Sequence, residues 1–332
     1  MTLRANYGRS NATFCVPGGF NVTKDPGELP AVFSQNQSPE LVDGASVDLE
    51  DYYQVEAFAD RVERARWPEF ASRVRQNTER TLELLNRTGT RATFFVLGYV
   101  AERDPALIRE VAAAGHEIAC HSHLHRRVHT LTPVEFREDV RRARGAIEDA
   151  AGVRVLGFRA PTFSVTLDSL WALDILLEEG FEYDSSIFPV RHDLYGIPDA
   201  PRFLHQLALP SGRSIWEIPM STVRMGGVNL PAAGGGYLRL IPLAVTRWAI
   251  RRIHRRDGQP VILYFHPWEL DPEQPRLRGG WKSRFRHYSG LKKTEARLQI
   301  ILTEGKFQPL INLVRKAQQP EQAAQVSLGN GD

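Results

Sequence analysis

The sequence predicts an α/β fold in which about seven parallel strands form a distorted (β/α) barrel. Short apolar runs alternate with helical patterns along most of the 332-residue chain, an order typical of parallel strands joined by crossover helices. Polar residues gather directly after several of the apolar runs, and barrel enzymes keep their reacting groups at the C-terminal ends of their strands. With 42% hydrophobic residues, the chain can bury the large core that such a fold needs.

The elements are predicted in alternation from Leu41 onward. After the first apolar run, Phe70, Val74 and Leu82 recur with the spacing of a helix face, and a glycine follows the end of that helix, as C-terminal caps do. Strands are expected at residues 45–49, 92–97, 117–120, 157–159, 216–219 and 261–266 and near Tyr183; helices are expected at residues 69–87, 104–114, 132–151, 167–179 and 238–250.

Composition divides the chain into three parts. Residues 1–43 contain Gly, Pro, Asn and Ser without sustained periodicity, so we expect a flexible N-terminal arm there. Residues 44–315 carry all the predicted elements and form one large domain. Residues 316–332 are rich in Gln, Ala, Gly and Asn, which predicts a disordered tail.

The charge balance argues against nucleic acid as a partner. There are 42 Lys and Arg residues against 39 Asp and Glu, a net charge of only +3. The arginines at 251, 252, 255 and 256 are expected on a solvated helix face, with a polyanion or membrane surface as the alternative. Two cysteines exclude a disulfide framework. No secretory or membrane-spanning pattern is found, which predicts a cytoplasmic protein.

A histidine cluster follows the strand predicted at residues 117–120. His121 and His125 are four residues apart and can face one point, whereas strand alternation turns His123 away. A zinc-type ion prefers such nitrogen ligands with a carboxylate, and it leaves one position for the water that it activates. Another strand end supplies candidate carboxylates, namely Asp48, Glu50 and Asp51. The alternative is a polar loop that holds histidines without a metal.

These segments resemble a known family. Asp48, residues 121–125, residues 159–161 and residues 264–266 are similar, in this order, to the motifs of the polysaccharide deacetylases with a NodB homology domain. Residues 46–53, 183–186 and 285–288 more closely resemble the subgroup found in exopolysaccharide loci of exosortase (PEP-CTERM) systems. The resemblance covers residues from about 44 to 312, of which about 270–312 resemble the subgroup alone.

The resemblance implies a distorted (β/α) barrel and a hydrolase that removes N-acetyl groups with one divalent metal ion, for which we expect Zn²⁺. By position, His121 and His125 are metal ligands. The family's adjacent pair of aspartates is absent, so the acidic ligand is either Glu50 or Asp51, and strand alternation favours Glu50.

Further roles carry over from the family by position. Asp48 corresponds to the general base, Arg159 to the residue that holds this base, and His266 to the general acid. The backbone amide of Thr162 lies where the family stabilises the developing oxyanion, although the family often has tyrosine there. Asp184 is either a residue that orients His266 or another catalytic group, or a turn residue.

Two aromatic residues, Tyr237 and Trp268, are expected to stack on sugar rings, with a place in the core as the alternative. The glycines at 234–236 lack the lysine of a phosphate loop and are expected to approach the substrate closely. Residues 272–288 are dense in arginines and aromatics, and a lid, a partner surface and a plain surface loop are all open.

Taken together, these features predict deacetylation of an N-acetylhexosamine-containing polysaccharide or its precursor in exopolysaccharide biosynthesis. The expected partners are an N-acetylated glycan and, peripherally, the exopolysaccharide assembly machinery. Two alternatives remain: an amidohydrolase acting on a small amide or cyclic imide, and a non-catalytic carbohydrate-binding protein.

Overall fold

A computed structural model describes residues 41–329 of this protein, with side chains up to residue 319. Residues 1–40 and 330–332 lie outside the described residues, and with them nearly all of the arm predicted at 1–43. The chain separates into two units, residues 1–40 and 41–332, and the second contains every element described below. Helix α10 (Leu310–Gly329) occupies most of the segment for which the sequence predicts a disordered tail.

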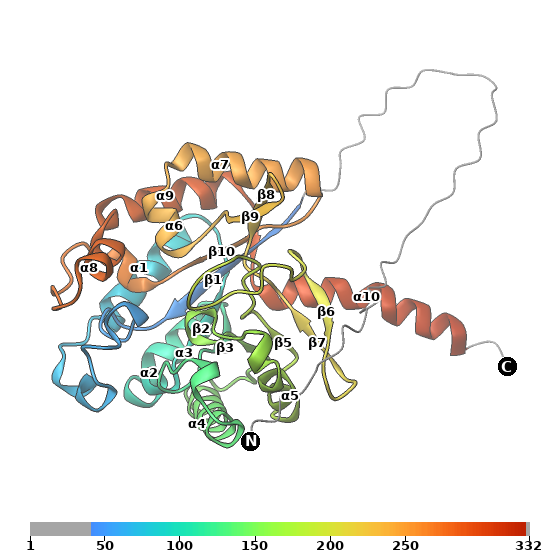
Figure 1. Ribbon diagram of the computed structural model, residues 1–332, viewed down its shortest axis with the longest axis horizontal. Coiled ribbons are helices and arrows are strands. Elements are labelled where there is room, and N and C mark those ends of the chain that lie inside the picture. The colour runs from blue at the N-terminus through green and yellow to red at the C-terminus, as the bar shows by residue number, and fades with distance from the viewer. Residues whose placement is uncertain (1–40, 330–332) are drawn as a thin grey trace, which may run out of the picture. The chain divides into compact units, whose positions relative to one another are not determined.

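A nine-stranded sheet forms the centre of the described chain, with strands in the order β10-β1-β2-β3-β4-β5-β7-β6 and β11 beside β1 (Figure 1). The seven strands from β10 to β7 are mutually parallel, and β6 (His205–Ala208) adds an antiparallel edge. The parallel strands are β1 (Asp43–Leu49), β2 (Thr93–Val96), β3 (Glu117–Cys120), β4 (Gly157–Phe158), β5 (Tyr183–Asp184), β7 (Ser214–Glu217), β10 (Ile262–Phe265) and β11 (Phe307–Gln308).

The predicted fold class is confirmed. The parallel sheet curls into half of a barrel and stays open, because within the described residues β10 pairs only with β1 and β6 pairs only with β7. Most predicted strands lie within a residue or two of their expected places. The strand predicted at 216–219 runs instead from Ser214 to Glu217, because its first residues pair with the antiparallel strand β6.

The crossover helices lie between the strands as predicted: α1 (Val74–Arg87), α3 (Pro105–Ala113), α4 (Pro133–Ala151) and α5 (Trp171–Glu178). Their ends follow local chemistry. Thr132 and Glu135 form a reciprocal capping box at the start of α4, and Gly152 ends that helix in the left-handed region. The helix expected from residue 69 starts later, at Val74, because residues 64–69 form a short 3-10 helix, η2 (Arg64–Glu69), that contains Pro68.

Several elements in the second half were not predicted. A hairpin joins β8 (Thr222–Met225) to β9 (Val228–Pro231). The helix expected at 238–250 is two helices, α6 (Gly235–Leu240) and α7 (Leu243–Arg252), because Ile241 and Pro242 are extended between them. The π-helix η6 (Ile253–Asp257) follows α7. Residues 272–288 contain α8 (Trp281–Tyr288), and α9 (Leu291–Glu304) comes after it. In the first half of the chain, the short helix α2 (Gly98–Arg103) was not predicted either.

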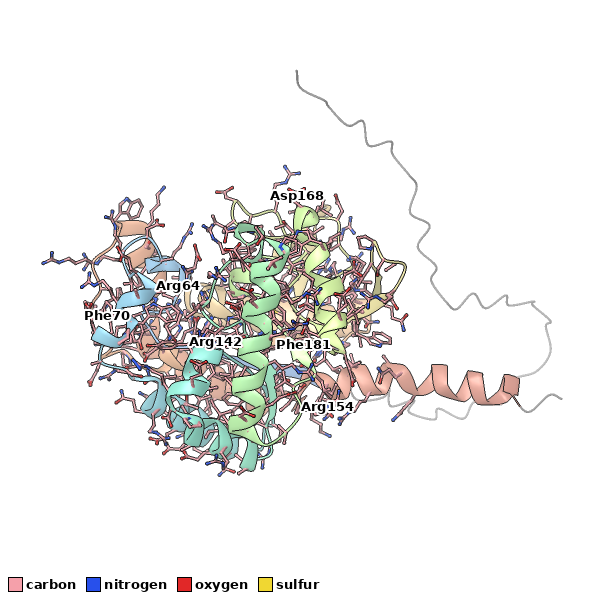
Figure 2. The ribbon with its side chains drawn as sticks, turned by 90° about the horizontal axis from the view of Figure 1, so that it is seen from below. Arg64, Phe70, Arg142, Arg154, Asp168 and Phe181 are labelled. Carbon is pink, nitrogen blue, oxygen red and sulfur yellow. The ribbon has the colours of Figure 1, made fainter. Side chains whose placement is uncertain are left out.

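The main core lies between the sheet and the helices that cover it. Phe136 of α4 packs edge-on against Phe158 of β4, which in turn contacts Phe181, all of them buried. In Figure 2, α4, which carries the labelled Arg142, crosses the front of this helical layer, and the labelled Phe181 lies beside it. This packing fixes the strands, and therefore the loops at their C-terminal ends, where the polar residues of the next section lie.

None of the helices that the structure describes combines the length and the apolar character that crossing a membrane requires.

Candidate active site

The predicted site residues meet at one edge of the sheet. Asp48 is the next-to-last residue of strand β1. His121 directly follows β3, Arg159 follows β4 and His266 follows β10. Because these strands are parallel and adjacent, their C-terminal ends reach the same edge. The polar residues after separate apolar runs are thus brought together from segments more than 200 residues apart in the sequence.

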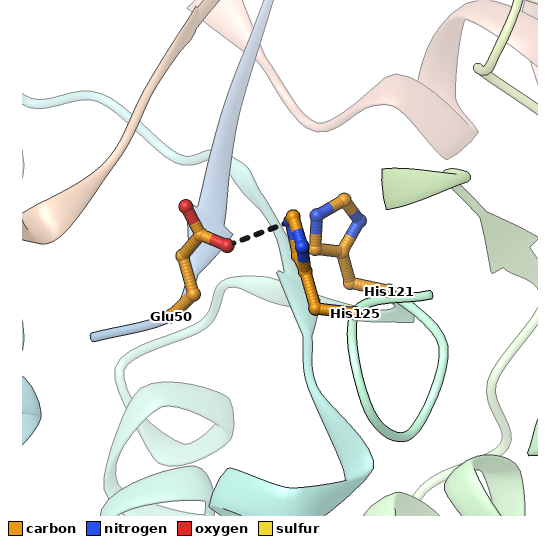
Figure 3. Close-up of side chains that lie close together, drawn as sticks. All are labelled: Glu50, His121 and His125. Atoms are coloured by element: carbon orange, nitrogen blue, oxygen red, sulfur yellow. Dashed lines mark ion pairs between the residues drawn. The ribbon is translucent and has the colours of Figure 1, made fainter. Parts of the chain in front are cut away.

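Glu50, His121 and His125 form a group of potential metal ligands, with ligand atoms within 4.8 Å of one another (Figure 3). The His125 Nε2 atom lies 3.0 Å from the Glu50 Oε2 atom. The loop that carries the histidines reverses sharply, with positive φ at Ser122 (67°) and His125 (51°), and this lets both rings face Glu50. All three ligand candidates are buried.

Hydrogen bonding prepares His121 for a metal. Its Nδ1 atom lies 2.8 Å from the carbonyl oxygen of Arg159, which can only accept, so Nδ1 carries the proton and Nε2 is left with a lone pair. The Oε2 atom of Glu50 is buried without a hydrogen-bond donor other than the facing imidazole. An orphaned carboxylate oxygen between two imidazoles is the donor set that a zinc-type ion prefers, so these residues fit a divalent ion.

The protonation states also suit ligation. Burial alone would raise the pKa of Glu50, but the imidazoles of His125, His266 and His121 lower this pKa to about 2. Burial lowers the pKa of His121 to about 4, against the opposing effect of Asp48. At neutral pH the site therefore holds an ionised carboxylate and a neutral imidazole, the forms in which both groups bind metals.

Asp51, the competing acidic ligand, lies elsewhere. Its Oδ2 atom accepts hydrogen bonds from the Ser72 hydroxyl at 2.7 Å and from the backbone amides of Arg73 and Val74 at 2.9 and 3.2 Å. Asp51 therefore caps the start of α1, because the chain turns after Glu50 and directs the two carboxylates to opposite sides. His123 also points away, with its backbone amide bonded to Asp139 at 2.7 Å.

Asp48 is held by Arg159. The Arg159 Nη1 atom donates to the Asp48 Oδ1 atom at 2.6 Å and to the Ser46 hydroxyl at 2.9 Å. Its Nη2 atom donates to the Ser185 hydroxyl at 3.0 Å, and its guanidinium lies 4.1 Å from the ring centre of Phe95. This arginine is fully buried, so the pair with Asp48 has a fixed geometry and is sheltered from solvent.

His266 faces Asp48 across the ligand group. Its Nε2 atom lies 3.8 Å from the Asp48 Oδ2 atom and 3.7 Å from the Glu50 Oε1 atom. On the other side of the ring, Nδ1 lies 3.3 Å from the Glu269 Oε2 atom. Burial lowers the pKa of His266, but Glu269, Glu50 and Asp48 outweigh it and raise this pKa to about 9.

Glu269 and Arg239 are site residues that the sequence analysis missed. Glu269 lies in the 3-10 helix η7 (Pro267–Leu270) and is fully buried; its Oε1 atom accepts a hydrogen bond from Arg239 Nε at 2.6 Å. Burial would raise the pKa of Glu269, yet Arg239 and His266 lower it to about 2. The sequence shows an acid three residues after His266 at a strand end, but Arg239 lies within an apolar run that predicts only a helix.

Trp268 lines the site cavity, but its contacts fit the alternative of a core residue better than that of a sugar platform. It is only 5% exposed, and its ring stacks on His266 and on His287, at centroid distances of 5.1 and 4.2 Å. Its Nε1 atom donates to the Glu50 Oε1 atom at 3.2 Å. The ring is thus occupied by protein contacts and orients Glu50, which leaves little surface for a sugar.

Of the interpretations that the sequence left open for Asp184, the contacts fit a turn residue, because its Oδ2 atom accepts the backbone amide of Ser186 at 3.1 Å. Asp184 is completely buried below the site, where its Oδ1 atom accepts a hydrogen bond from the Ser186 hydroxyl at 2.6 Å. The same hydroxyl accepts the backbone amide of Ala160 at 2.7 Å. Burial raises the pKa of Asp184 and of the adjoining Glu217. Asp184 therefore contacts, through Ser186, the loop that follows Arg159, and it does not contact His266.

A cavity of about 440 Å³ opens above these residues. Thr162, which has a positive φ of 58°, lies on its wall, as do Tyr237 and the glycines Gly235 and Gly236. Gly235 and the preceding Gly234 pack against the ring of Tyr264, where a larger residue would collide with it. The volume falls within the range of about 300 to 1,000 Å³ that ligand pockets usually have.

Two regions of the chain match models of known protein families. Residues 67–176 match the model described as "Polysaccharide deacetylase", and residues 185–315 match "Domain of unknown function (DUF3473)". His121, His125 and Arg159 fall in the first region, whereas Arg239, His266 and Glu269 fall in the second; Asp48 and Glu50 precede both. The two regions therefore contribute to one site.

Curated relatives include a peptidoglycan deacetylase-like protein of Gibberella zeae, 29% identical over 166 residues, which are 49% of this chain and 47% of the relative. A chitooligosaccharide deacetylase of Bradyrhizobium sp. is 33% identical over 100 residues, 30% of this chain and 43% of the relative. The matches thus span less than half of the length of these relatives.

Two solved structures share the fold. A structure from Mycobacterium smegmatis assigned as a polysaccharide deacetylase superposes with a TM-score of 0.55 at 21% identity, covering 86% of this chain and 93% of that one. An allantoinase superposes with a TM-score of 0.52 at 16% identity, covering 73% and 72%. At these identities the likeness concerns the fold alone. Residues 67–176 are thus similar to the polysaccharide deacetylase family model, and the curated relatives with this name match less than half of this chain.

Proposed function

We propose that this protein is a metal-dependent N-deacetylase that acts on an N-acetylhexosamine-containing polysaccharide or its precursor. One observation carries the proposal: Asp48, fixed by Arg159, and His266 face each other at 3.8 Å beside the group of Glu50, His121 and His125. Amide hydrolysis needs a base for water and an acid for the departing amine around an electrophilic centre, and this arrangement provides all three. The names of the chitooligosaccharide and peptidoglycan deacetylase relatives support the substrate class.

Glu50, His121 and His125 would hold the metal ion, and we propose Zn²⁺ because two imidazoles and one carboxylate form a typical catalytic zinc set. When bound, such an ion acts as a Lewis acid that polarises the acetyl carbonyl and lowers the pKa of water. Trp268 supports this set by holding the second oxygen of Glu50 through its indole N–H.

Side chains of the protein accept and donate the protons of the reaction. Asp48 accepts a proton from water as the water oxygen forms a bond to the acetyl carbon, and Arg159 keeps the carboxylate aimed at that water. The backbone amide of Thr162 donates to the carbonyl oxygen as negative charge develops there. His266 delivers its proton to the nitrogen as the carbon–nitrogen bond breaks, so that acetate and a free amine leave. Glu269 keeps the imidazole of His266 in position.

Exopolysaccharide biosynthesis is the proposed setting. The support is the resemblance of residues 46–53, 183–186 and 285–288 to the exosortase-associated subgroup, together with the place of these residues in the site. Ser185 bonds to Arg159, and His287 stacks on Trp268, so the subgroup segments contact the reacting groups. Tyr237 on the cavity wall is the proposed platform for a sugar ring.

Acetate release tests the proposal. Full-length protein loaded with zinc is incubated with N-acetylchitooligosaccharides and, separately, with a cyclic imide. We expect acetate from the glycan, with the rate lowered about 10²- to 10⁴-fold in Asp48→Asn. Asp168→Asn, a matched change on the surface, should leave the rate unchanged; Asp168 is labelled in Figure 2.

The other outcomes are decisive as well. Hydrolysis of the imide without any acetate from glycans would replace the substrate class by small amides. A protein that binds zinc stoichiometrically but releases nothing from either compound would remove the enzyme proposal and leave a carbohydrate-binding role.

A further inference from the structure

An exposed surface that combines apolar side chains with arginines lies away from the catalytic residues. Its apolar members are Met225, Val228 and Leu230 of the β8–β9 hairpin and Val245 and Trp248 of α7, which are between 39% and 58% exposed. Its charged members are Arg251, Arg252, Arg255 and Arg256. We call these nine residues the arginine–apolar surface.

The hairpin presents one apolar face. Its turn is Gly226-Gly227, both with positive φ (55° and 83°), as a two-residue hairpin turn requires. In the register, Met225 lies opposite Val228 and Val223 lies opposite Leu230, so these four side chains share a face, while Arg224 lies on the other. Of the four, only Val223 is buried. A short two-stranded hairpin gains little from apolar groups that stay in water, which suggests that this face has a partner.

Helix α7 continues the surface. Thr246 and Ala249 face the core, which leaves Val245, Trp248 and Arg251 on the outer side at helical spacing. The guanidinium of Arg252 lies 5.6 Å from the ring centre of Trp248 and donates to the backbone oxygen of Arg224 at 3.5 Å. This contact joins the hairpin to the helix, and Figure 1 shows the two lying side by side.

The arginines of this surface lack acidic partners. Within the described part of the chain, none of these four arginines forms an ion pair within 4.0 Å, whereas Arg247 on the same helix pairs with Glu304 at 2.6 Å. A cavity of about 350 Å³ lies between the hairpin turn and the end of the helix, lined by Arg224, Arg252 and Arg256 together with Arg202. Asp257, the acid in this cavity, is already paired with Arg202 at 3.1 Å. The surface is therefore complementary to anions.

We propose that the arginine–apolar surface docks on an anionic lipid bilayer. The arginines would bind lipid phosphates, while Met225, Val228 and Trp248 enter the boundary between headgroups and acyl chains. A soluble polyanion would satisfy the arginines but would leave the apolar side chains in water, so the bilayer accounts for more of the observations.

Vesicle co-sedimentation of the full chain tests this proposal. The vesicles contain phosphatidylcholine alone, or phosphatidylcholine with about one third phosphatidylglycerol. We expect binding to the anionic vesicles only, and weaker binding at high salt. Arg251→Gln with Arg255→Gln should lower the partition coefficient about 25-fold, at about fivefold for each arginine. Met225→Ser with Val228→Ser should also lower it, because less apolar area enters the bilayer.

Matched variants control for charge and hydrophobicity. Arg109→Gln with Arg154→Gln removes the same charge from exposed positions elsewhere, and Arg154 is labelled in Figure 2. Val153→Ser with Leu167→Ser removes apolar groups that are 48% and 68% exposed. Both controls should bind vesicles like the unchanged protein, and thermal unfolding should show that every variant is folded.

Three results would overturn the proposal. The first is absence of binding to anionic vesicles at low salt. The second is an equal loss in the Arg109 and Arg154 control, which would mean that net charge alone acts. The third is that the protein binds vesicles and soluble polyglutamate with equal strength, and that Met225→Ser with Val228→Ser has no effect on either. This result would assign the surface to soluble polyanions.

Discussion

Glu50 and Asp51 are neighbours with the same kind of side chain, and their surroundings give them different tasks. The Glu50 carboxylate faces two imidazoles, whereas the Asp51 carboxylate accepts three hydrogen bonds at the start of α1. We therefore expect Glu50→Gln to lower the zinc content of the protein strongly, because an amide is a poor replacement for a charged ligand. Asp51→Asn should keep the zinc and lower the free energy of unfolding by about 1 kcal/mol, the usual effect of a weakened helix cap.

Metal analysis of the two purified variants, with denaturant unfolding beside it, measures both effects. Loss of zinc in Asp51→Asn with retention in Glu50→Gln would reverse the assignment of the acidic ligand.

Glu269 is predicted to act on the reaction by positioning His266. Glu269→Gln should lower kcat about 10- to 100-fold with little change in KM, because the imidazole loses the carboxylate that fixes it. The variant also leaves Arg239 buried without its partner, which is destabilising by about 3 to 5 kcal/mol. Combining it with Arg239→Gln should restore much of the stability and leave kcat low.

Steady-state kinetics and unfolding of the single and double variants separate these effects. If the double variant recovers kcat together with stability, Glu269 has only a structural role.

Part of the candidate site could be predicted from the sequence. Asp48, His121, His125, Arg159 and His266 could be found because each follows an apolar run within a motif of the family, and the structure brings them together. Arg239 and Glu269 could not be found in this way, because a buried ion pair between two distant segments leaves no local pattern. For Trp268 the sequence left a sugar platform and a core position open, since an aromatic residue beside a catalytic one has the same appearance in sequence whether it contacts ligand or protein.

At the scale of the elements, close packing between strands makes Gly157 sensitive. A Cβ atom at this position in β4 would overlap the ring of Tyr183 in β5, which is fully buried and donates a hydrogen bond to Glu117 at 2.8 Å. Gly157→Ala should therefore lower the free energy of unfolding by about 1 to 3 kcal/mol through overpacking.

Gly145→Ala is the matched control. This glycine lies inside α4 with nothing near its missing Cβ, so alanine should stabilise the protein by about 0.5 to 1 kcal/mol. Chemical denaturation of both variants checks the opposite signs; equal effects would show that Tyr183 moves freely to make room.

Elements with strong periodicity or capping signals were predicted well, and those without them were not. Helix α4 has a complete capping box, and its predicted and observed bounds agree to one residue. The β8–β9 hairpin was missed although its two-glycine turn lies between alternating apolar residues, because each of its strands is only four residues long. The link between α6 and α7 depends on Pro242, whose effect is hidden within a continuous apolar pattern.

For the whole molecule, the order of strands and helices was sufficient to predict a parallel sheet, because crossover connections determine the strand direction. Its curled, open form could not be derived from that order. The antiparallel strand β6 ends the sheet beside β7, and this pairing depends on a turn at residues 209–213 with no distinctive spacing. Parallel pairing is also the reason that residues from both matched family regions reach one site.

The pH dependence of stability should show the effect of a buried neutral histidine remote from the site. His116 is 8% exposed, its Nδ1 atom accepts the backbone amide of Ala92 at 3.1 Å, and burial, with a smaller contribution from Arg91, lowers its pKa to about 4. The unfolded chain has the ordinary value near 6.5 and so binds more protons between these two values. Stability that is fully present above pH 6.5 is therefore lost as the pH falls toward 4.

His116→Gln removes this titration while keeping an acceptor for the Ala92 amide. We expect the unchanged protein to lose on the order of 2 kcal/mol more than the variant between pH 7 and pH 4. Denaturant unfolding at a series of pH values measures the difference, in which contributions of other acidic and basic groups cancel. Parallel pH profiles for the two proteins would mean that His116 titrates at the same pH in the folded and unfolded chain, and that the cavity around it admits water.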